Sequence, residues 1–83
     1  MKPSLGRVVL VRVDPRQNNG SDEAPATITR VFGEHPDGGW VVNVRVQLDA
    51  FEMPLWLTSV RLFDEPSVGV RDMSHTAWWP PRA

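Results

Sequence analysis

The stretch Gly39-Trp40-Val41-Val42-Asn43-Val44-Arg45-Val46-Gln47-Leu48-Asp49-Ala50 decides the fold of this chain. From Trp40 to Leu48 every even-numbered residue is apolar, and from Asn43 to Asp49 every odd-numbered residue is polar. This period of two is typical of a β-strand with one buried face and one solvated face. We therefore expect the rest of the chain to cover the apolar row.

Three other runs have the composition of β-strands, because they are rich in β-branched or aromatic residues and are bounded by turn formers. They are residues 6–13 (GRVVLVRV), 26–32 (ATITRVF) and 55–63 (LWLTSVRLF). The Gly-rich residues 33–39 predict a hairpin turn before the central strand. Residues 68–71 predict a short fifth strand, and no window of the chain has helical periodicity.

Strict alternation assigns the two faces of these strands. In residues 55–63 it places on one face Trp56, Thr58, Val60 and Leu62. In residues 26–32 it places on one face Ala26, Ile28, Arg30 and Phe32.

Two segments lie outside the strand pattern. Residues 14–25 (DPRQNNGSDEAP) are polar and rich in turn formers, which predicts a flexible loop. Residues 74–83 (SHTAWWPPRA) form an aromatic and proline-rich tail with two of the four tryptophans. Two adjacent indoles in water would be a costly exposed patch, so we expect the tail to dock on its own barrel or on a neighbouring subunit.

The chain has 83 residues, no cysteine and a formal net charge of −1. We expect one domain over residues 1–83, and its thin stability margin without disulfides favours a homo-oligomer. The strands predict an all-β fold, namely a small bent-sheet SH3-like or OB-like barrel of four to five antiparallel strands with a docked C-terminal tail. We see no signal peptide and no apolar run of membrane-spanning length, so we expect a cytoplasmic location and no membrane partner.

Side chains suited to catalysis are scarce. Cys and Tyr are absent, the one Lys is Lys2, and the two histidines, His35 and His75, are far apart in the sequence. They have no carboxylates at metal-binding spacing. The sequence therefore predicts a protein that is not an enzyme and has no metal site or cofactor.

Arginine and tryptophan are the residue types here that suit ligand binding. A nucleotide-type ligand needs a ring to stack on, guanidinium groups for its phosphates and hydroxyl partners. The candidate ligand-binding residues are Arg45, Trp56, Thr58, Ser59, Arg61, Trp78, Trp79 and Arg82. Arg45 and Arg61 share a surface only if their strands pair suitably, and the alternative for both is an ordinary solvated sheet face.

The tail tryptophans have alternatives of their own. They either plug the core, provide a stacking surface for a planar ligand, or belong to a Trp-Pro-Pro-Arg motif that docks on another protein.

Five short motifs follow one another along the chain. They are Gly6 to Val9, Pro25-Ala26 to Val31-Phe32, Val42-Asn43 to Val46, Trp56 to Val60, and Trp79-Pro80-Pro81-Arg82. In this ordered set the chain resembles a group of small accessory proteins of tailed phages and prophages, most of them without an assigned function. The group often has Trp-His-Trp before the prolines, where this chain has Ala77-Trp78-Trp79. The resemblance implies a role in the host cytoplasm, and small phage β-proteins of this kind include sponges that bind nucleotide-derived immune signals.

Three functions remain open. The first is a non-enzymatic phage-type binding protein, an anti-defence sponge that sequesters a small anionic, nucleotide-derived bacterial immune signal. The second is a structural or interaction module, either a virion accessory part or an adaptor that docks on a host protein. The third is an OB-like single-strand nucleic-acid binder, against which the net charge of −1 counts.

Overall fold

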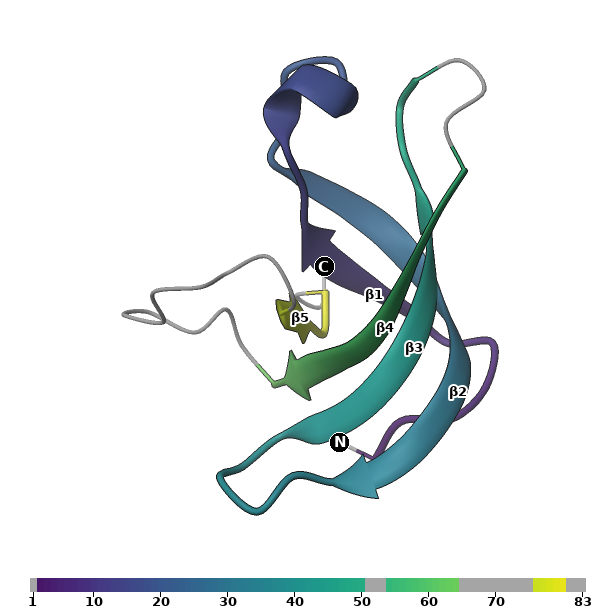
Figure 1. Cartoon of the computed structure of the whole chain (residues 1–83), viewed down its shortest axis with the longest axis vertical. Helices are drawn as coiled ribbons and strands as arrows, with labels where there is room; N and C mark the ends of the chain where they lie inside the picture. Colours follow the sequence, from purple (N-terminus) through teal and green to yellow (C-terminus); the bar gives the residue numbers. More distant parts are fainter. Residues whose placement is uncertain (1, 51–53, 65–75, 81–83) are drawn as a thin grey trace.

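A computed structural model describes residues 2–50, 54–64 and 76–80, and it shows a closed five-stranded barrel (Figure 1). The elements are β1 (Val8–Arg12), the 3-10 helix η1 (Pro15–Gln17), β2 (Glu23–Glu34), β3 (Trp40–Gln47), β4 (Pro54–Phe63) and β5 (Thr76–Trp78). The predicted all-β fold, a small SH3-like or OB-like barrel, is confirmed.

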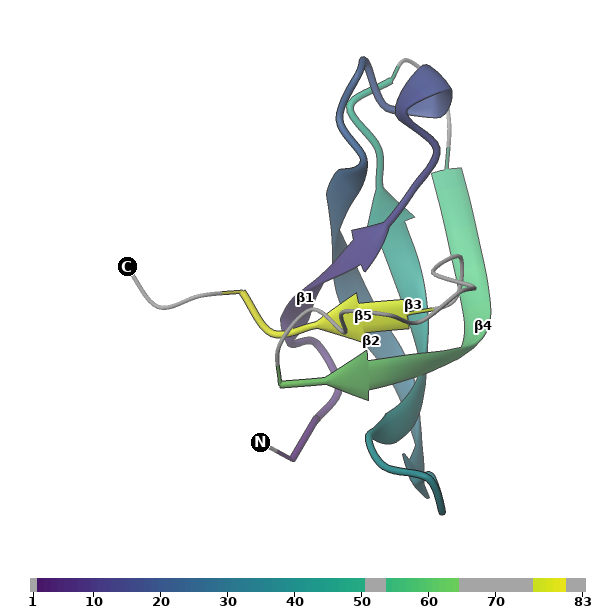
Figure 2. The same cartoon turned by 90° about the vertical axis from the view of Figure 1, so that its left-hand side faces the viewer.

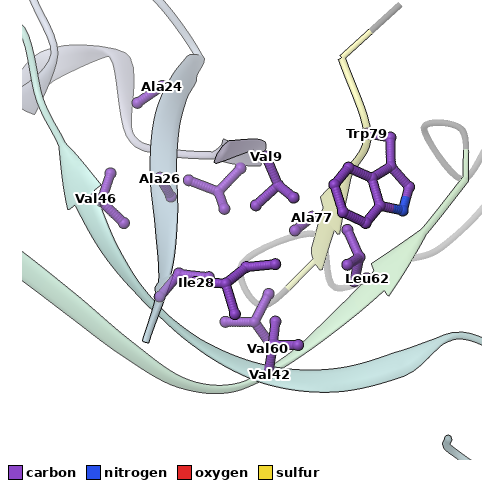
Figure 3. Packing of buried hydrophobic residues seen from close by; sticks show 12 residues of the cluster. Val9, Ala24, Ala26, Ile28, Val42, Val46, Val60, Leu62, Ala77 and Trp79 are labelled. Atoms are coloured by element: carbon purple, nitrogen blue, oxygen red, sulfur yellow. The ribbon is translucent and has the colours of Figure 1, made fainter. Parts of the chain in front are cut away.

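β3 is the central strand, as its period of two predicts. It pairs antiparallel with β2 on one side and with β4 on the other. Val42, Val44 and Val46 are buried, and the core around them is built mainly from small branched side chains of all five strands (Figure 3). The core residues are Val9, Val11, Ala24, Ala26, Ile28, Val42, Val44, Val46, Val60, Leu62, Ala77 and Trp79.

β5 closes the barrel. It lies between β1 and β4, antiparallel to the first and parallel to the second (Figures 1 and 2). The sequence predicted a docked tail but not a strand here, and the expectation of antiparallel pairing throughout is wrong for β4 and β5. The tail docks on the barrel of its own chain over residues 76–79, which are buried, whereas Pro80 is exposed. Residues 68–71, predicted as the fifth strand, lie outside the described residues.

A register shift in β4 overturns the faces predicted for that strand. The shift lies between the β3 partners Val42 and Val44, and on β4 it falls at Thr58 and Ser59. A bulge adds one residue to a strand, so the inward parity changes across it. The β4 side chains that pack on the core are Leu55 and Leu57 before the shift and Val60 and Leu62 after it. Trp56 therefore points outward, and the predicted common face with Val60 and Leu62 is wrong.

β2 contains two similar shifts, at which Thr29 and Phe32 are the extra residues. Ala26 and Ile28 before the shifts are buried. Arg30 and Phe32 are exposed, so the common face predicted for these four residues is wrong. Bulges redirect side chains in this way because each extra residue is left without a partner in the ladder.

The loop before β2 is shorter than the predicted 14–25, because β2 already begins at Glu23. The buried side chain of Asn18 ties this loop to two neighbouring segments. Its Nδ2 donates to the carbonyl oxygens of Ser21 at 3.0 Å and Glu23 at 2.9 Å. Its Oδ1 accepts from the backbone amide of Asp49 just after β3. These bonds hold residues 18–23 against the segment after β3, while the flexibility expected for residues 14–25 stays a prediction.

Candidate binding surface

Arg45 and Trp56 lie directly opposite each other on the outer face of β3 and β4. Residues paired in this way have Cβ atoms about 5 Å apart. Trp56 is 53% exposed, and Arg45 is also exposed. Within the described part of the chain, Arg45 makes no hydrogen bond or ion pair. An indole and an unpaired guanidinium therefore stand side by side in solvent.

Residues of β1 and β2 extend this pair into a row across four strands. Thr27 of β2 lies opposite Arg45, and Val8 of β1 lies opposite Thr27. Gln47 Nε2 donates to Thr27 Oγ1 at 3.1 Å, which fixes the hydroxyl beside Arg45. Val8 is 46% exposed and gives the β1 end of the row an apolar surface.

The charges of the chain are segregated. The strand segments 27–33, 41–47 and 54–63 contain three arginines and no acidic residue, so all ten Asp and Glu lie elsewhere. The three arginines are Arg30, Arg45 and Arg61. Local charge, rather than net charge, sets the potential that a ligand meets at a surface. The outer face formed by residues 27–33 of β2 with β3 and β4 is therefore cationic, although β2 has a glutamate at each end, Glu23 and Glu34, and the whole chain carries −1.

Arg61 shares this outer face with Arg45, but its guanidinium is used by the fold. It lies opposite Val41, four residues from Arg45 along β3, or about 13 Å at strand spacing. Its Nη2 donates to the carbonyl oxygen of Gly38 at 2.7 Å, and its Cζ lies 5.1 Å from the centre of the Phe63 ring. Arg61 thereby holds the turn between β2 and β3.

Thr58 and Ser59 build the bulge of β4. The Thr58 hydroxyl donates to Asn43 Oδ1 at 2.9 Å, and the Ser59 amide donates to the same oxygen at 3.0 Å. Asn43 is buried, although alternation predicted it on the solvated face. Asn43 Oδ1 thus holds both residues, so the structure gives Thr58 and Ser59 a role in the bulge.

The two tail tryptophans are buried, Trp78 at 3% exposure and Trp79 at 9%. Trp79 belongs to the core cluster beside Leu62 and Ala77 (Figure 3). The Cζ of Arg12 lies 5.3 Å from the centre of the Trp78 ring, and that of Arg7 lies 5.3 Å from the Trp79 ring. The rings are therefore part of the barrel rather than an open stacking surface.

The remaining candidate from the sequence, Arg82, lies outside the described residues. Two residues that alternation placed on one face with Ala26 and Ile28 join the cationic surface instead. Phe32 is 53% exposed, and the Cζ of Arg30 lies 5.0 Å from the centre of its ring. Arg30 also lies opposite Asn43, on the same outer face as Arg45. Strict alternation could not assign Arg30 and Phe32 to this surface, because the bulges of β2 change which residues point outward.

A cleft of about 220 Å³ opens beside the hairpin turn. It is lined by Gly39, Trp40, Leu62, Phe63 and Asp64, and none of the candidate ligand-binding residues contributes to it. Among the described residues, no three His, Asp or Glu side chains are placed to hold a metal ion, and no helix is long and apolar enough to span a bilayer.

Comparisons of the chain with protein-family models, with curated proteins and with solved structures find no significant match. The resemblance to phage accessory proteins therefore stays a prediction. The candidate surface rests on the geometry of its own residues.

Proposed function

We propose that this protein is a non-enzymatic binding protein for a small anionic ligand of nucleotide type, held on the outer face of β3 and β4. The observation that carries the proposal is the direct opposition of Arg45 and Trp56 in the β3–β4 register. A base stacks on the exposed indole, and the neighbouring guanidinium pairs with a phosphate through two parallel hydrogen bonds. The absence of acidic residues from these strand segments favours the anion further.

One ring and one arginine set a limit on the affinity. Stacking of a base on an aromatic side chain contributes about 1–3 kcal/mol. Each of the two hydrogen bonds between the guanidinium and the phosphate adds about 1.5–3 kcal/mol. Because association itself has an entropic cost, this pair alone supports a dissociation constant no tighter than about the millimolar range. A physiological ligand must therefore extend beyond Arg45 and Trp56.

The biological role proposed is sequestration. A protein that binds a signal and does not convert it lowers the free concentration of that signal by mass action. The sequence resemblance supplies the proposed context, a phage-type sponge for a nucleotide-derived immune signal in the host cytoplasm. A single-strand nucleic-acid binder is the second candidate function. The net charge of −1 counts against it, but the cationic outer face provides a local positive surface for a phosphate backbone.

Calorimetric titration with AMP, an ADP-ribose derivative and cyclic dinucleotides tests the proposal. We expect heat of binding with at least one of them, and its loss in Trp56→Ala and Arg45→Ala. Two control variants make the same kinds of change at exposed positions outside the candidate binding surface. Arg16→Ala removes the same charge at a position whose side chain is 90% exposed, and Leu5→Ala removes a 68% exposed apolar side chain.

Two outcomes would count against the proposal. Absence of heat with every nucleotide removes its support, and an equal loss of binding in the controls shows that the ligand sits elsewhere. Recovery of one stoichiometric protein partner, without a small molecule, indicates the interaction module instead. The absorbance ratio and mass spectrum of the purified protein give an independent check, because both reveal a co-purifying nucleotide.

A further inference from the structure

We infer that the ligand is a dinucleotide, with two bases joined through two phosphates, which binds along a diagonal row on the outer face of the barrel. The diagonal row consists of Trp56, Arg45, Arg30 and Phe32, and the inference rests on the proposed function. The ligand class follows from the order of side chains along the diagonal row, which is aromatic ring, guanidinium, guanidinium, aromatic ring.

The strand registers place the two cations next to each other. Arg30 of β2 lies opposite Asn43, which is two residues from Arg45 and on the same face of β3. Neighbouring strands are about 4.8 Å apart and two residues span about 7 Å, so the Cα atoms of Arg30 and Arg45 lie about 8 Å apart. Within the described residues neither guanidinium makes a hydrogen bond or an ion pair. Two unpaired positive charges thus stand at the middle of the row.

The aromatic residues occupy the two ends. Trp56 continues the row on β4, and Phe32 continues it on β2, where a bulge turns the side chain outward. By the same strand spacing their Cα atoms lie about 15 Å apart. Both side chains are 53% exposed although both are large and apolar. Each exposed ring therefore offers a face on which a base can stack.

A dinucleotide presents its groups in the matching order, base, phosphate, phosphate, base. The first base stacks on Trp56 while Arg45 and Arg30 each pair with a phosphate. The second base has the Arg30–Phe32 pair as its platform, because bases stack on guanidinium planes as well as on rings. A mononucleotide spans half of the row and leaves Arg30 and Phe32 without a ligand.

Titrations of the full chain with AMP, diadenosine diphosphate (two adenosines joined through two phosphates) and cyclic di-AMP test the inference. We expect at least one dinucleotide to bind about tenfold or more tightly than AMP, which is what one further base stack provides. Arg30→Ala and Phe32→Ala should reduce that dinucleotide affinity to the level of AMP and leave AMP binding unchanged. Arg16→Ala is the matched control, because the Arg16 side chain is highly exposed and lies outside the row. It should change neither the AMP affinity nor the dinucleotide affinity.

The outcomes separate this inference from the proposed function. If AMP binds as tightly as both dinucleotides, or if Arg30→Ala leaves dinucleotide binding unchanged, the dinucleotide assignment is overturned while the nucleotide site stands. If none of the three ligands binds and the ADP-ribose derivative does not bind either, the proposed function fails as well. The last titration uses a deoxyadenosine decamer. If the decamer binds, if Arg30→Ala abolishes that binding, and if neither dinucleotide binds more tightly than AMP, single-strand binding replaces the inference.

Discussion

Asn43 Oδ1 accepts a hydrogen bond of 3.0 Å from the backbone amide of Ser59, at the bulge where β4 changes its inward parity. Ser59 has a φ of 56°, which lies in the left-handed region. Without the bulge, the parity that buries Val60 and Leu62 would also turn Trp56 into the barrel. The Asn43–Ser59 contact thus supports the exposure of the indole on which the proposed site depends.

Asn43→Ala removes the acceptor of both the Ser59 amide and the Thr58 hydroxyl. We expect the free energy of unfolding to fall by about 2 kcal/mol, because part-buried donors lose their partner. Urea denaturation followed by circular dichroism measures the change. Gln47→Ala is the control, since it removes one exposed hydrogen bond to Thr27 and should cost well below 1 kcal/mol. An Asn43→Ala protein as stable as the parent would show that the bulge does not need the amide.

Ser59→Gly relieves the backbone strain at the same bulge. A side chain in the left-handed region costs roughly 1–2 kcal/mol, whereas glycine adopts it freely. Since glycine also loses more entropy on folding, we expect a net stabilisation of about 0.5–1 kcal/mol. Thermal unfolding measures it. Ser59→Ala removes the hydroxyl and keeps the Cβ, so it should not stabilise, and equal effects of the two variants would contradict the strain argument.

The central strand and the barrel were predictable because the apolar row of β3 has a strict period. Val42, Val44 and Val46 point into the core whatever their neighbours do, since a half-buried strand has no other face for them. The docking of the tail was predictable for a similar reason, because Trp78 and Trp79 carry too much apolar surface to remain in water.

The bulges were not predictable, and they decide the site. Whether a strand takes an extra residue depends on the strand paired with it, which local composition does not contain. Thr29, Phe32 and Ser59 look like ordinary strand or loop residues in the sequence. At these bulges the inward parity of the strand changes, so Arg30, Phe32 and Trp56 lie on the outer face. Strict alternation could not predict that these three side chains share one face.

Asp14 provides a prediction about pH. Its carboxylate accepts hydrogen bonds from the Arg16 guanidinium and from the Arg16 amide, and these bonds lower the pKa of Asp14 below its ordinary value. A lowered pKa in the folded state means that the contribution of Asp14 to stability is present above its unfolded pKa. That contribution is lost as the pH falls through the folded pKa.

Carboxyl-carbon NMR titration should therefore place the Asp14 midpoint below that of an unfolded-peptide reference. In Arg16→Ala the midpoint should rise towards the reference, because the side-chain bonds from Arg16 have the largest effect on this pKa. An unchanged midpoint in the variant would show that the guanidinium does not hold the carboxylate in solution.

Replacing Trp79 and Trp56 by alanine compares the same substitution at a buried and at a half-exposed position. Trp79→Ala opens a cavity beside Leu62 and Ala77 where β5 closes the barrel, and we expect a loss of about 3–5 kcal/mol. That is comparable to the whole stability of a small domain, so the variant should be largely unfolded in circular dichroism. Trp56→Ala, at a half-exposed position, should cost about 1 kcal/mol or less and should stay folded while losing the nucleotide. The two roles are then separated, since one indole holds the barrel closed and the other serves the ligand. A folded Trp79→Ala protein of near-parental stability would show that β5 is dispensable for closure.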